Sequence, residues 1–317
     1  MKQRSDWRNE TLVEGFLQSL IQDARCYFID YRLVSKHTVY ELTKEFSAKD
    51  IHGGGNFFVI HTCLRLEIYS FSGELNMPHR GFATLEGEMA IRRMLSLMVG
   101  TQSEIIGETE VLGQIKNAIA NSASLGLLTK TTFWDLLATI DLAENLRTEY
   151  NINCTENYST IGAEIFDNLV SSDGEVLSVI GSGYMAEFFF RTLRKAKTSK
   201  IYWINRNVRK AKKVQKIIQE LDQCDITHLS IDECRGALET SDFIFAAYKN
   251  GDQMFADCDV SKAKAVVDVS YPPLFADKCN RNFLSINNTF FERYVNHPVS
   301  KVSLLECEQK IDLLLGL

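Results

Sequence analysis

Cys63 and Arg65 are the residues of this chain whose types and spacing could carry out a covalent reaction. They lie in the octapeptide TCLRLEIY (residues 62–69), directly after an apolar run at 57–60 that predicts a buried strand. A thiolate is the nucleophilic form of cysteine, and a neighbouring cation favours it over the thiol. Alternate residues of an extended strand share one face, so His61, Cys63 and Arg65 are predicted to point into one space. The pattern therefore predicts a cysteine nucleophile beside an arginine that can grip a carboxylate.

A glycine-rich segment further along the chain predicts a dinucleotide site. It lies between a predicted strand (176–180) and a predicted helix (185–195), and its G-x-G-x-x-A pattern is formed by Gly181, Ser182, Gly183, Tyr184, Met185 and Ala186. Glycines let the backbone approach a pyrophosphate, whose charge the helix N-terminus stabilises. The alternative is a tight strand–helix turn without a ligand. A nucleophilic cysteine and a nicotinamide site together favour hydride transfer to or from a carbonyl held as a thioester.

The end of the next predicted strand indicates which dinucleotide binds. Proteins that bind NAD place an acidic residue there for the ribose hydroxyls. This chain has Asn205 and Arg206 instead, and further cations follow them. A cationic pocket fits a 2′-phosphate, so NADPH is the predicted cofactor. For Lys212 and Lys213 a solvated helix face is the preferred interpretation.

The hydrophobic pattern predicts an α/β protein with a long helix between two domains. Apolar residues recur at helical spacing over 131–149, and from residue 176 strands and helices alternate as in a doubly wound parallel sheet. We therefore predict an α+β catalytic domain (1–130), a connecting helix and linker (131–160), a Rossmann-type NADP-binding domain (161–295) and a short C-terminal helix (296–317).

Composition and cysteine spacing exclude several classes of function. The net charge of −6 over 317 residues argues against a globally basic nucleic-acid binder. Eight cysteines include no pair closer than ten residues, so neither a C-x-x-C metal site nor a disulfide framework is predicted. The polar N-terminus and the lack of an apolar run of ~18 residues predict a cytoplasmic protein without a membrane span.

Motifs along nearly the whole chain resemble those of the glutamyl-tRNA reductase family. Residues 61–69 resemble S-T-C-N-R-x-E-x-Y, residues 103–114 resemble S-x-x-x-G-E-x-Q-I-L-G-Q, and residues 146–149 resemble the V-R-T-E of the family's long helix. The Rossmann glycines, Asn205-Arg206 and the segment 267–272 follow in the same order. Together these motifs are far more specific than any one of them.

The resemblance implies reduction of glutamyl-tRNA(Glu) by NADPH to glutamate-1-semialdehyde, the first step of the C5 route to 5-aminolevulinate and tetrapyrroles. Cys63 would attack the glutamyl ester and release the tRNA, and hydride would then reduce the thioester. Arg65 is implied to bind the substrate's carboxylate and Glu108 its ammonium. The other implied substrate positions are Thr62, Leu64, Ser103, Thr109, Glu110 and Gln114. Without the resemblance, residues 103–114 would be interpreted as a capped helix start.

Three positions depart from the family pattern. Leu64 stands where the family has asparagine, Glu110 where it has glutamine, and Arg93 where it has a histidine thought to matter for activity. Arg93 is expected either to support thiolate formation or to face solvent. His61 is expected either to supply an imidazole or to be a partly buried polar residue.

Partners are implied by the resemblance alone. It implies glutamate-1-semialdehyde aminomutase, the next enzyme, as a partner. It also implies a homodimer, but only about one helix follows the Rossmann domain here, whereas the family has a longer helical dimerisation domain.

Two other functions remain open. Semialdehyde dehydrogenases also use cysteine thioesters, but they place the Rossmann unit first. A catalytically impaired regulatory relative that binds tRNA or cofactor would account for Leu64 and Arg93, whereas Cys63 together with Arg65 argues for an enzyme.

Overall fold

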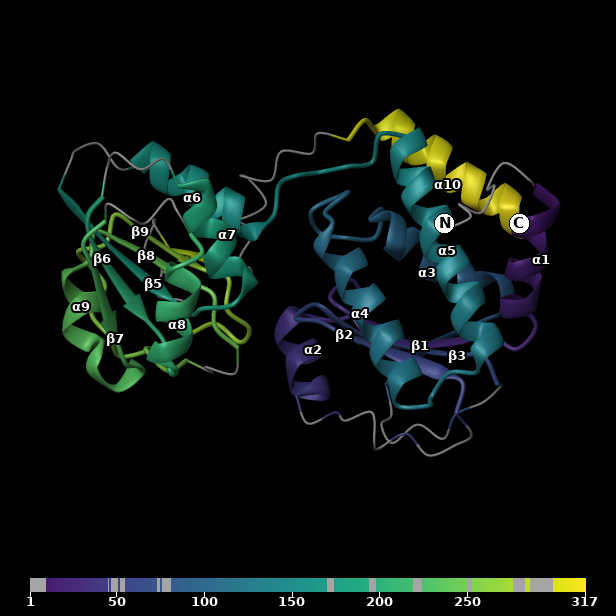
Figure 1. The fold of residues 1–317 in the computed structure, drawn as a ribbon, viewed down its shortest axis with the longest axis horizontal. Helices are drawn as coiled ribbons and strands as arrows, with labels where there is room; N and C mark the ends of the chain where they lie inside the picture. Colours follow the sequence, from purple (N-terminus) through teal and green to yellow (C-terminus); the bar gives the residue numbers. More distant parts are fainter. Residues whose placement is uncertain are drawn as a thin grey trace. The chain divides into compact units, whose positions relative to one another are not determined.

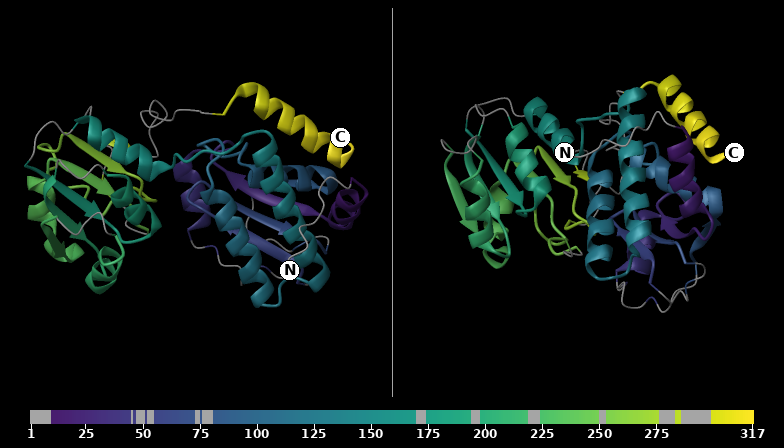
Figure 2. Two further views of the ribbon diagram at one scale, coloured as in Figure 1. Left: turned by 45° about the horizontal axis from the view of Figure 1, so that its top comes forward. Right: turned by 45° about the vertical axis from the view of Figure 1, so that its right-hand side comes forward.

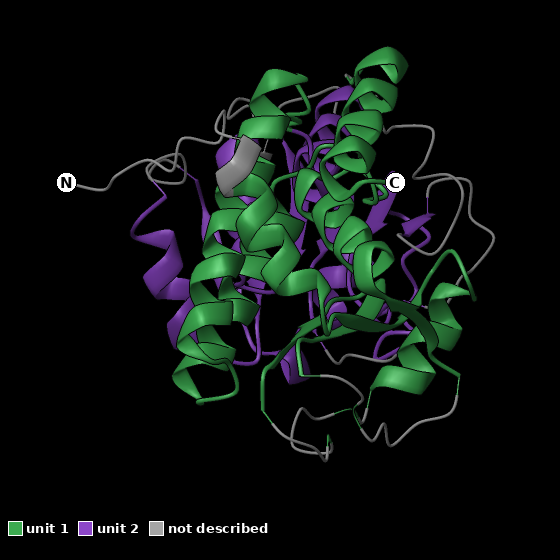
Figure 3. Cartoon of the chain, turned by 90° about the vertical axis from the view of Figure 1, so that its right-hand side faces the viewer, with its two compact units in different colours: residues 1–155, 297–317 green, residues 156–296 purple. Residues whose placement is uncertain are grey.

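The computed structural model describes most of the chain, in two compact units. The described residues are 10–44, 46, 51, 55–72, 75, 81–169, 174–193, 198–218, 224–249, 253–275, 283–285 and 299–317. Unit 1 comprises residues 1–155 and 297–317, and unit 2 comprises residues 156–296 (Figure 3). Unit 1 carries the cysteine motif, and unit 2 carries the glycine-rich motif.

Unit 1 is built on an antiparallel sheet with the strand order β2-β3-β1-β4. Its strands are β1 (Arg25–Asp30), β2 (Phe57–His61), β3 (Arg65–Ser70) and β4 (Ala83–Glu86). The predicted strand at 57–60 is confirmed as β2. It forms a hairpin with β3, in which Phe57 pairs with Ser70 at one end and His61 with Leu66 at the other.

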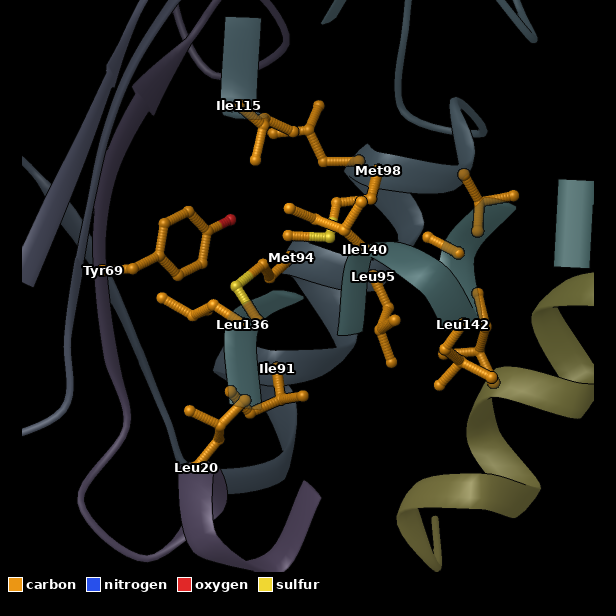
Figure 4. Packing of buried hydrophobic residues seen from close by; sticks show 14 of the residues in the cluster. Leu20, Tyr69, Ile91, Met94, Leu95, Met98, Ile115, Leu136, Ile140 and Leu142 are labelled. Atoms are coloured by element: carbon orange, nitrogen blue, oxygen red, sulfur yellow. The ribbon is translucent and has the colours of Figure 1, made fainter. Parts of the chain in front are cut away.

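Helices cover the sheet of unit 1 (Figure 1). They are α1 (Glu10–Ile21), α2 (Lys36–Thr43), α3 (Gly87–Val99), α4 (Glu110–Ser124), α5 (Lys130–Glu149) and α10 (Lys301–Leu315). The apolar side of α3, with Met94, Leu95 and Met98, packs in one core with Leu136 and Ile140 of α5 (Figure 4). The helical spacing predicted over 131–149 is thus confirmed as α5, whose apolar positions are the ones it buries.

The last helix, α10, packs within unit 1. Cys307, Ile311 and Leu315 are buried in the same hydrophobic core as α3. Arg92 of α3 forms ion pairs with Glu308 and Asp312. Figure 2 shows α10, in yellow, lying along the other helices of this unit. Its buried face is therefore occupied by its own chain, while the role of this region in dimerisation stays a prediction.

Unit 2 is a parallel sheet with helices, as the alternating pattern predicts. The described strands follow the order β10-β9-β8-β5-β6-β7, all parallel. They are β5 (Glu175–Ile180), β6 (Thr198–Ile204), β7 (Ile226–Leu229), β8 (Phe243–Ala246), β9 (Ala265–Asp268) and β10 (Phe283–Ser285). The strand order reverses between β5 and β8, which is where doubly wound sheets bind ligands.

Four helices of unit 2 accompany this sheet in the described residues. They are α6 (Tyr158–Leu169), α7 (Tyr184–Thr192), α8 (Val208–Gln215) and α9 (Arg235–Thr240). Phe189 of α7 stacks on Phe245 of β8 with ring centroids 4.0 Å apart, which fixes the helix on the sheet. The end of the predicted helix at 185–195 and the predicted domain boundary at 295–296 lie outside the described residues. No helix among the described residues is long and apolar enough to cross a membrane.

Candidate active site

Cys63 lies on the tight turn between β2 and β3. The Thr62 N–H donates to the carbonyl oxygen of Arg65 at 2.9 Å, which closes the turn. His61 pairs with Leu66 across the hairpin, and neighbouring residues of a strand point to opposite faces, so His61 and Arg65 point away from each other. The prediction that His61, Cys63 and Arg65 share one face is therefore wrong, because the chain reverses direction at Cys63.

Arg65, the first residue of β3 after this turn, is buried and contacts Gln102 and Glu67. Its side chain is 3% exposed; Nη2 donates to the carbonyl oxygen of Gln102 at 2.8 Å, and Nη1 lies 3.4 Å from Oε1 of Glu67. The guanidinium thus fastens the hairpin to the loop at 100–109, and a buried carboxylate matches its charge. The cation expected to favour the thiolate is therefore partly neutralised by Glu67. Binding of the substrate's carboxylate by Arg65 stays a prediction.

Arg93 occupies the centre of a buried ion-pair network. Nη2 contacts Oδ2 of Asp30 at 2.6 Å and Oε1 of Glu67 at 2.7 Å, while Nε donates to Oε2 of Glu67 at 3.1 Å. The guanidinium carbon lies 3.6 Å from the centroid of the Phe28 ring. Burial opposes its charge, but the carboxylate of Glu67 prevails and raises the pKa of Arg93. The expectation that Arg93 faces solvent is wrong, because this face of α3 packs on a sheet that carries two buried carboxylates.

Acidic side chains surround the thiol of Cys63. Burial raises its pKa to about 12, and the charges of Glu108, Glu104 and Glu110 act in the same direction. Burial likewise raises the pKa of Glu108 to about 8, and Glu110 adds to that shift. Cys63 is therefore a thiol in the free protein at neutral pH, contrary to the thiolate that the nearby arginine predicted. A cationic group entering this acidic pocket would stabilise the thiolate.

This electrostatic arrangement predicts a distinctive reactivity of Cys63. Because its pKa lies roughly three units above that of an ordinary cysteine, its alkylation by iodoacetamide at pH 7 should be roughly 1,000-fold slower. The rate should rise about tenfold per pH unit up to about pH 12. Peptide mass spectrometry of alkylated protein across a pH series measures the rate at Cys63 alone.

Replacing Glu108 with glutamine tests the role of the neighbouring carboxylate. Below pH 8 the carboxyl of Glu108 is largely protonated and neutral, so E108Q should leave the alkylation rate nearly unchanged there. Above pH 8 the variant lacks a negative charge beside the thiolate, so Cys63 should react faster than in the wild type. E88Q, at an exposed position of α3, is the matched control. An equal rate in E108Q and the wild type at pH 9–10 would contradict this account.

The loop at 100–109 carries two of the acidic residues near Cys63, Glu104 and Glu108, and Arg147 of α5 holds this loop by hydrogen bonds. Nη1 of Arg147 donates to the carbonyl oxygen of Val99 at 2.8 Å, and Nη2 donates to that of Gly107. Gly107 has φ 79°, a backbone conformation that favours glycine, and a Cβ on it would make a tight contact of 3.3 Å with the Cys154 nitrogen. The sequence motif at 146–149 did not predict this role of Arg147. A charged residue within the pattern of an amphipathic helix could have indicated it, because buried arginines are usually paired.

The other predicted substrate positions fall into two groups. Thr62 and Leu64 flank Cys63 on the turn, and Leu64 is buried. The remaining ones lie in the loop at 100–109 and at the start of α4: Ser103, Glu108, Thr109, Glu110 and Gln114. The hydroxyl of Ser103 is buried without a hydrogen-bond partner among the described residues, and Thr109 precedes α4 without a side-chain cap bond. The segment is therefore not a helix start capped by the side chain of Thr109, and substrate binding by these residues stays a prediction. Thr109 and Gln114 are exposed.

The glycine-rich loop of unit 2 leaves no room for a side chain at its first position. Gly181 has φ 112°, and a Cβ on it would lie 2.2 Å from the carbonyl oxygen of Ala247. Helix α7 then begins at Tyr184, and Gly183 at its N-cap provides no side chain to occupy the free N–H groups. Asn205 Nδ2 donates to Ser182 Oγ at 2.6 Å and fastens the loop to the end of β6. This is a cradle that fits a pyrophosphate.

Arg206 is the exposed cation beside this loop. Its guanidinium carbon lies 5.4 Å from the centroid of the Tyr248 ring, and it has no hydrogen bond or ion pair with another described residue. An uncompensated guanidinium at the end of β6 fits the 2′-phosphate of NADP(H). Tyr248 was missed by sequence analysis, because a tyrosine just after a strand carries no sequence signal of its own.

Comparisons with known proteins match the two units separately. Residues 23–150 match the family model described as glutamyl-tRNAGlu reductase, N-terminal domain, and residues 161–283 match the model described as shikimate / quinate 5-dehydrogenase. Glutamyl-tRNA reductase of Methanocaldococcus jannaschii is 27% identical over 202 residues, which cover 61% of this chain and 50% of that protein. The Myxococcus xanthus protein of the same name is 27% identical over 173 residues, covering 48% of this chain and 38% of the relative.

The solved structure of glutamyl-tRNA reductase from Methanopyrus kandleri covers 93% of this chain and 79% of its own, with 17% identity and a TM-score of 0.44. The chain spans about half the length, or less, of the curated relatives named above.

Fold and site together define a two-domain protein in which an α+β unit with a cysteine on a hairpin turn precedes a Rossmann-type unit. The two matched models follow this order along the chain. Residues 23–150 are thus similar to the N-terminal domain of glutamyl-tRNA reductases, and the curated relatives named above carry that name.

Proposed function

We propose that this chain catalyses the NADPH-dependent reduction of glutamyl-tRNA(Glu) to glutamate-1-semialdehyde. The observation that carries the proposal is Cys63 on the β2–β3 turn, near the acidic side chains of Glu108, Glu104 and Glu110, in the unit that matches the family's N-terminal domain. The glycine cradle and the exposed Arg206 of unit 2, which pairs with no carboxylate among the described residues, support NADPH as the cofactor. In unit 1, Glu108 could bind a substrate's α-ammonium, Arg65 its carboxylate, and Cys63 could attack its activated ester.

Cys63 and Glu108 have different roles in the proposed reaction. Sγ of Cys63 attacks the ester carbonyl, the bond to the 3′-terminal ribose oxygen of the tRNA breaks, and that oxygen takes up a proton. The substrate's ammonium lowers the pKa of Glu108, and the carboxylate that forms holds this ammonium beside Cys63. When bound, NADPH supplies the hydride that reduces the glutamyl thioester to the aldehyde, and Cys63 is released.

Arg206 provides the test of the cofactor proposal. R206D should lower kcat/KM for NADPH relative to NADH by roughly 10- to 100-fold, because it replaces a charge-assisted contact to the 2′-phosphate with repulsion. K213D makes the same change of charge on the exposed side of α8 and should leave the ratio unaltered. Steady-state kinetics with both cofactors gives the ratio. An unchanged ratio in R206D would remove Arg206 from the cofactor site.

A single-turnover assay tests the whole proposal. Full chain mixed with NADPH and glutamyl-tRNA should release free tRNA and form glutamate-1-semialdehyde with equal stoichiometry. Release of tRNA without aldehyde, or binding of tRNA without release, would favour the regulatory relative. Reduction of an acyl phosphate but not of glutamyl-tRNA would favour a semialdehyde dehydrogenase.

Further proposals concern the partner, the assembly and the location of the enzyme. The aldehyde product is reactive, so an aminomutase that consumes it is the proposed partner, and a homodimer is the proposed assembly. A cytoplasmic location is proposed because the described cysteines are free thiols.

A further inference from the structure

Tyr248, two residues after the end of β8, is the aromatic residue that contacts Arg206. The two side chains come from opposite sides of β5 in the sheet, since β8 and β6 are its two neighbours. The contact between the ring and the guanidinium, whose carbon lies 5.4 Å from the ring centroid, therefore joins residues that follow the two neighbours of β5. Among the described residues this ring is the group that orients Arg206, because no carboxylate pairs with it.

The backbone at Tyr248 is fixed by hydrogen bonds on both sides. The Tyr248 N–H donates to Oγ of Ser270 at 3.0 Å, and the Ser270 N–H donates to Oδ1 of the buried Asp268 at 3.0 Å. On the other side, the Ala247 N–H donates to the carbonyl oxygen of Ile180 at 2.8 Å. The tyrosine therefore projects from a rigid support that lies against the glycine-rich loop.

This position lies beside the place where the adenosine ribose of a dinucleotide must bind. In a doubly wound sheet the pyrophosphate sits at the glycine-rich turn, and the ribose hydroxyls lie at the end of the next strand, here β6. The 2′-phosphate would thus approach Arg206 while the ring of Tyr248 supports the guanidinium from the other side. The tyrosine hydroxyl has no hydrogen-bond partner among the described residues, so the contact to Arg206 is made by the ring alone.

We propose that Tyr248 is a positioning residue that determines specificity for NADP(H), because its ring holds Arg206 in the orientation that binds the 2′-phosphate. The inference rests on the proposed function for the identity of the cofactor. It adds a residue that follows β8 to a specificity element that the sequence placed after β6 alone.

Direct binding of NADPH and NADH to the full chain, measured by calorimetry without tRNA, tests this proposal. Y248L should raise the Kd for NADPH by roughly 3- to 30-fold and leave the Kd for NADH within about twofold. Y248F retains the ring and should bind both cofactors like the wild type. Y202L removes a ring that lies under Lys200 at 5.0 Å in the same unit, and it should not alter the preference.

A double-mutant cycle separates positioning from simple packing. In an R206A background, Y248L should have no further effect on NADPH binding, because the group that it orients is gone. Equal loss of NADPH and NADH affinity in Y248L, or the same loss with and without Arg206, would overturn the inference. Wild-type protein that does not prefer NADPH would overturn the cofactor proposal and this inference together. Normal NADPH preference without reduction of glutamyl-tRNA would sink the proposed function alone.

Discussion

Replacing Cys63 with serine should lower the rate of aldehyde formation by roughly 10,000-fold or more while leaving NADPH binding unchanged. A serine hydroxyl is a far weaker nucleophile, because it ionises much less readily than a thiol, and the acidic side chains near this position oppose formation of either anion. Single-turnover kinetics with glutamyl-tRNA measures the loss. C224S, at another half-buried cysteine but in unit 2, should retain full activity.

A covalent intermediate separates a nucleophilic role of Cys63 from a structural one. Wild-type protein incubated with glutamyl-tRNA in the absence of NADPH should acquire one glutamyl group on the peptide that contains Cys63, detectable by mass spectrometry. C63S should not form this thioester. Aldehyde formation by C63S at the wild-type rate would rule out the proposed chemistry, whatever the state of the cofactor site.

Replacing Glu67 with glutamine should destabilise unit 1 by about 3–5 kcal/mol, because removing one partner of a buried ionic network leaves the others uncompensated. Glu67 is fully buried between Arg65 and Arg93, and it also accepts a hydrogen bond from the Tyr69 hydroxyl at 2.6 Å. In E67Q two guanidinium groups would share the carboxylate of Asp30 alone.

Hydrogen exchange of amides in β1 and β3 measures the stability of this unit separately from unit 2. E86Q is the matched control: Glu86 pairs with Arg25 at 3.6 Å with its side chain 63% exposed, so its loss should cost less than about 1 kcal/mol. Similar protection in E67Q and E86Q would show that the buried network contributes little. Because the network also fastens the turn that carries Cys63, E67Q should slow acylation even at temperatures where unit 1 is folded.

Local requirements made part of this structure predictable. The turn after β5 needs glycine at residue 181 because the backbone there has a positive φ and an adjoining carbonyl leaves no room for a Cβ. Apolar residues at helical spacing predict helix α5. The end of α3 is predicted by Gly100, which has φ 91°. For α3 and α5 residues nearby in the chain favour the conformation, whereas at Gly181 the carbonyl that excludes a side chain belongs to the distant Ala247.

Long-range pairing decided the chemistry of the site. Arg93 meets Asp30 from 63 positions away, and Arg65 meets Gln102 from 37. The sequence predicted an arginine that activates the thiol, but the fold surrounds that arginine with a buried carboxylate and a carbonyl, and surrounds the thiol with acids instead.

By itself, the sequence predicted the order of the two units, the cysteine proposed as the nucleophile and the glycine-rich motif, since each depends on residues that are close in the chain. Only the tertiary structure decided the ionisation of Cys63, the burial of Arg65 and Arg93, the packing of α10 on unit 1 and the support of Arg206 by Tyr248. Charge and solvation in these places depend on groups that folding brings together from distant segments, and no local pattern records them.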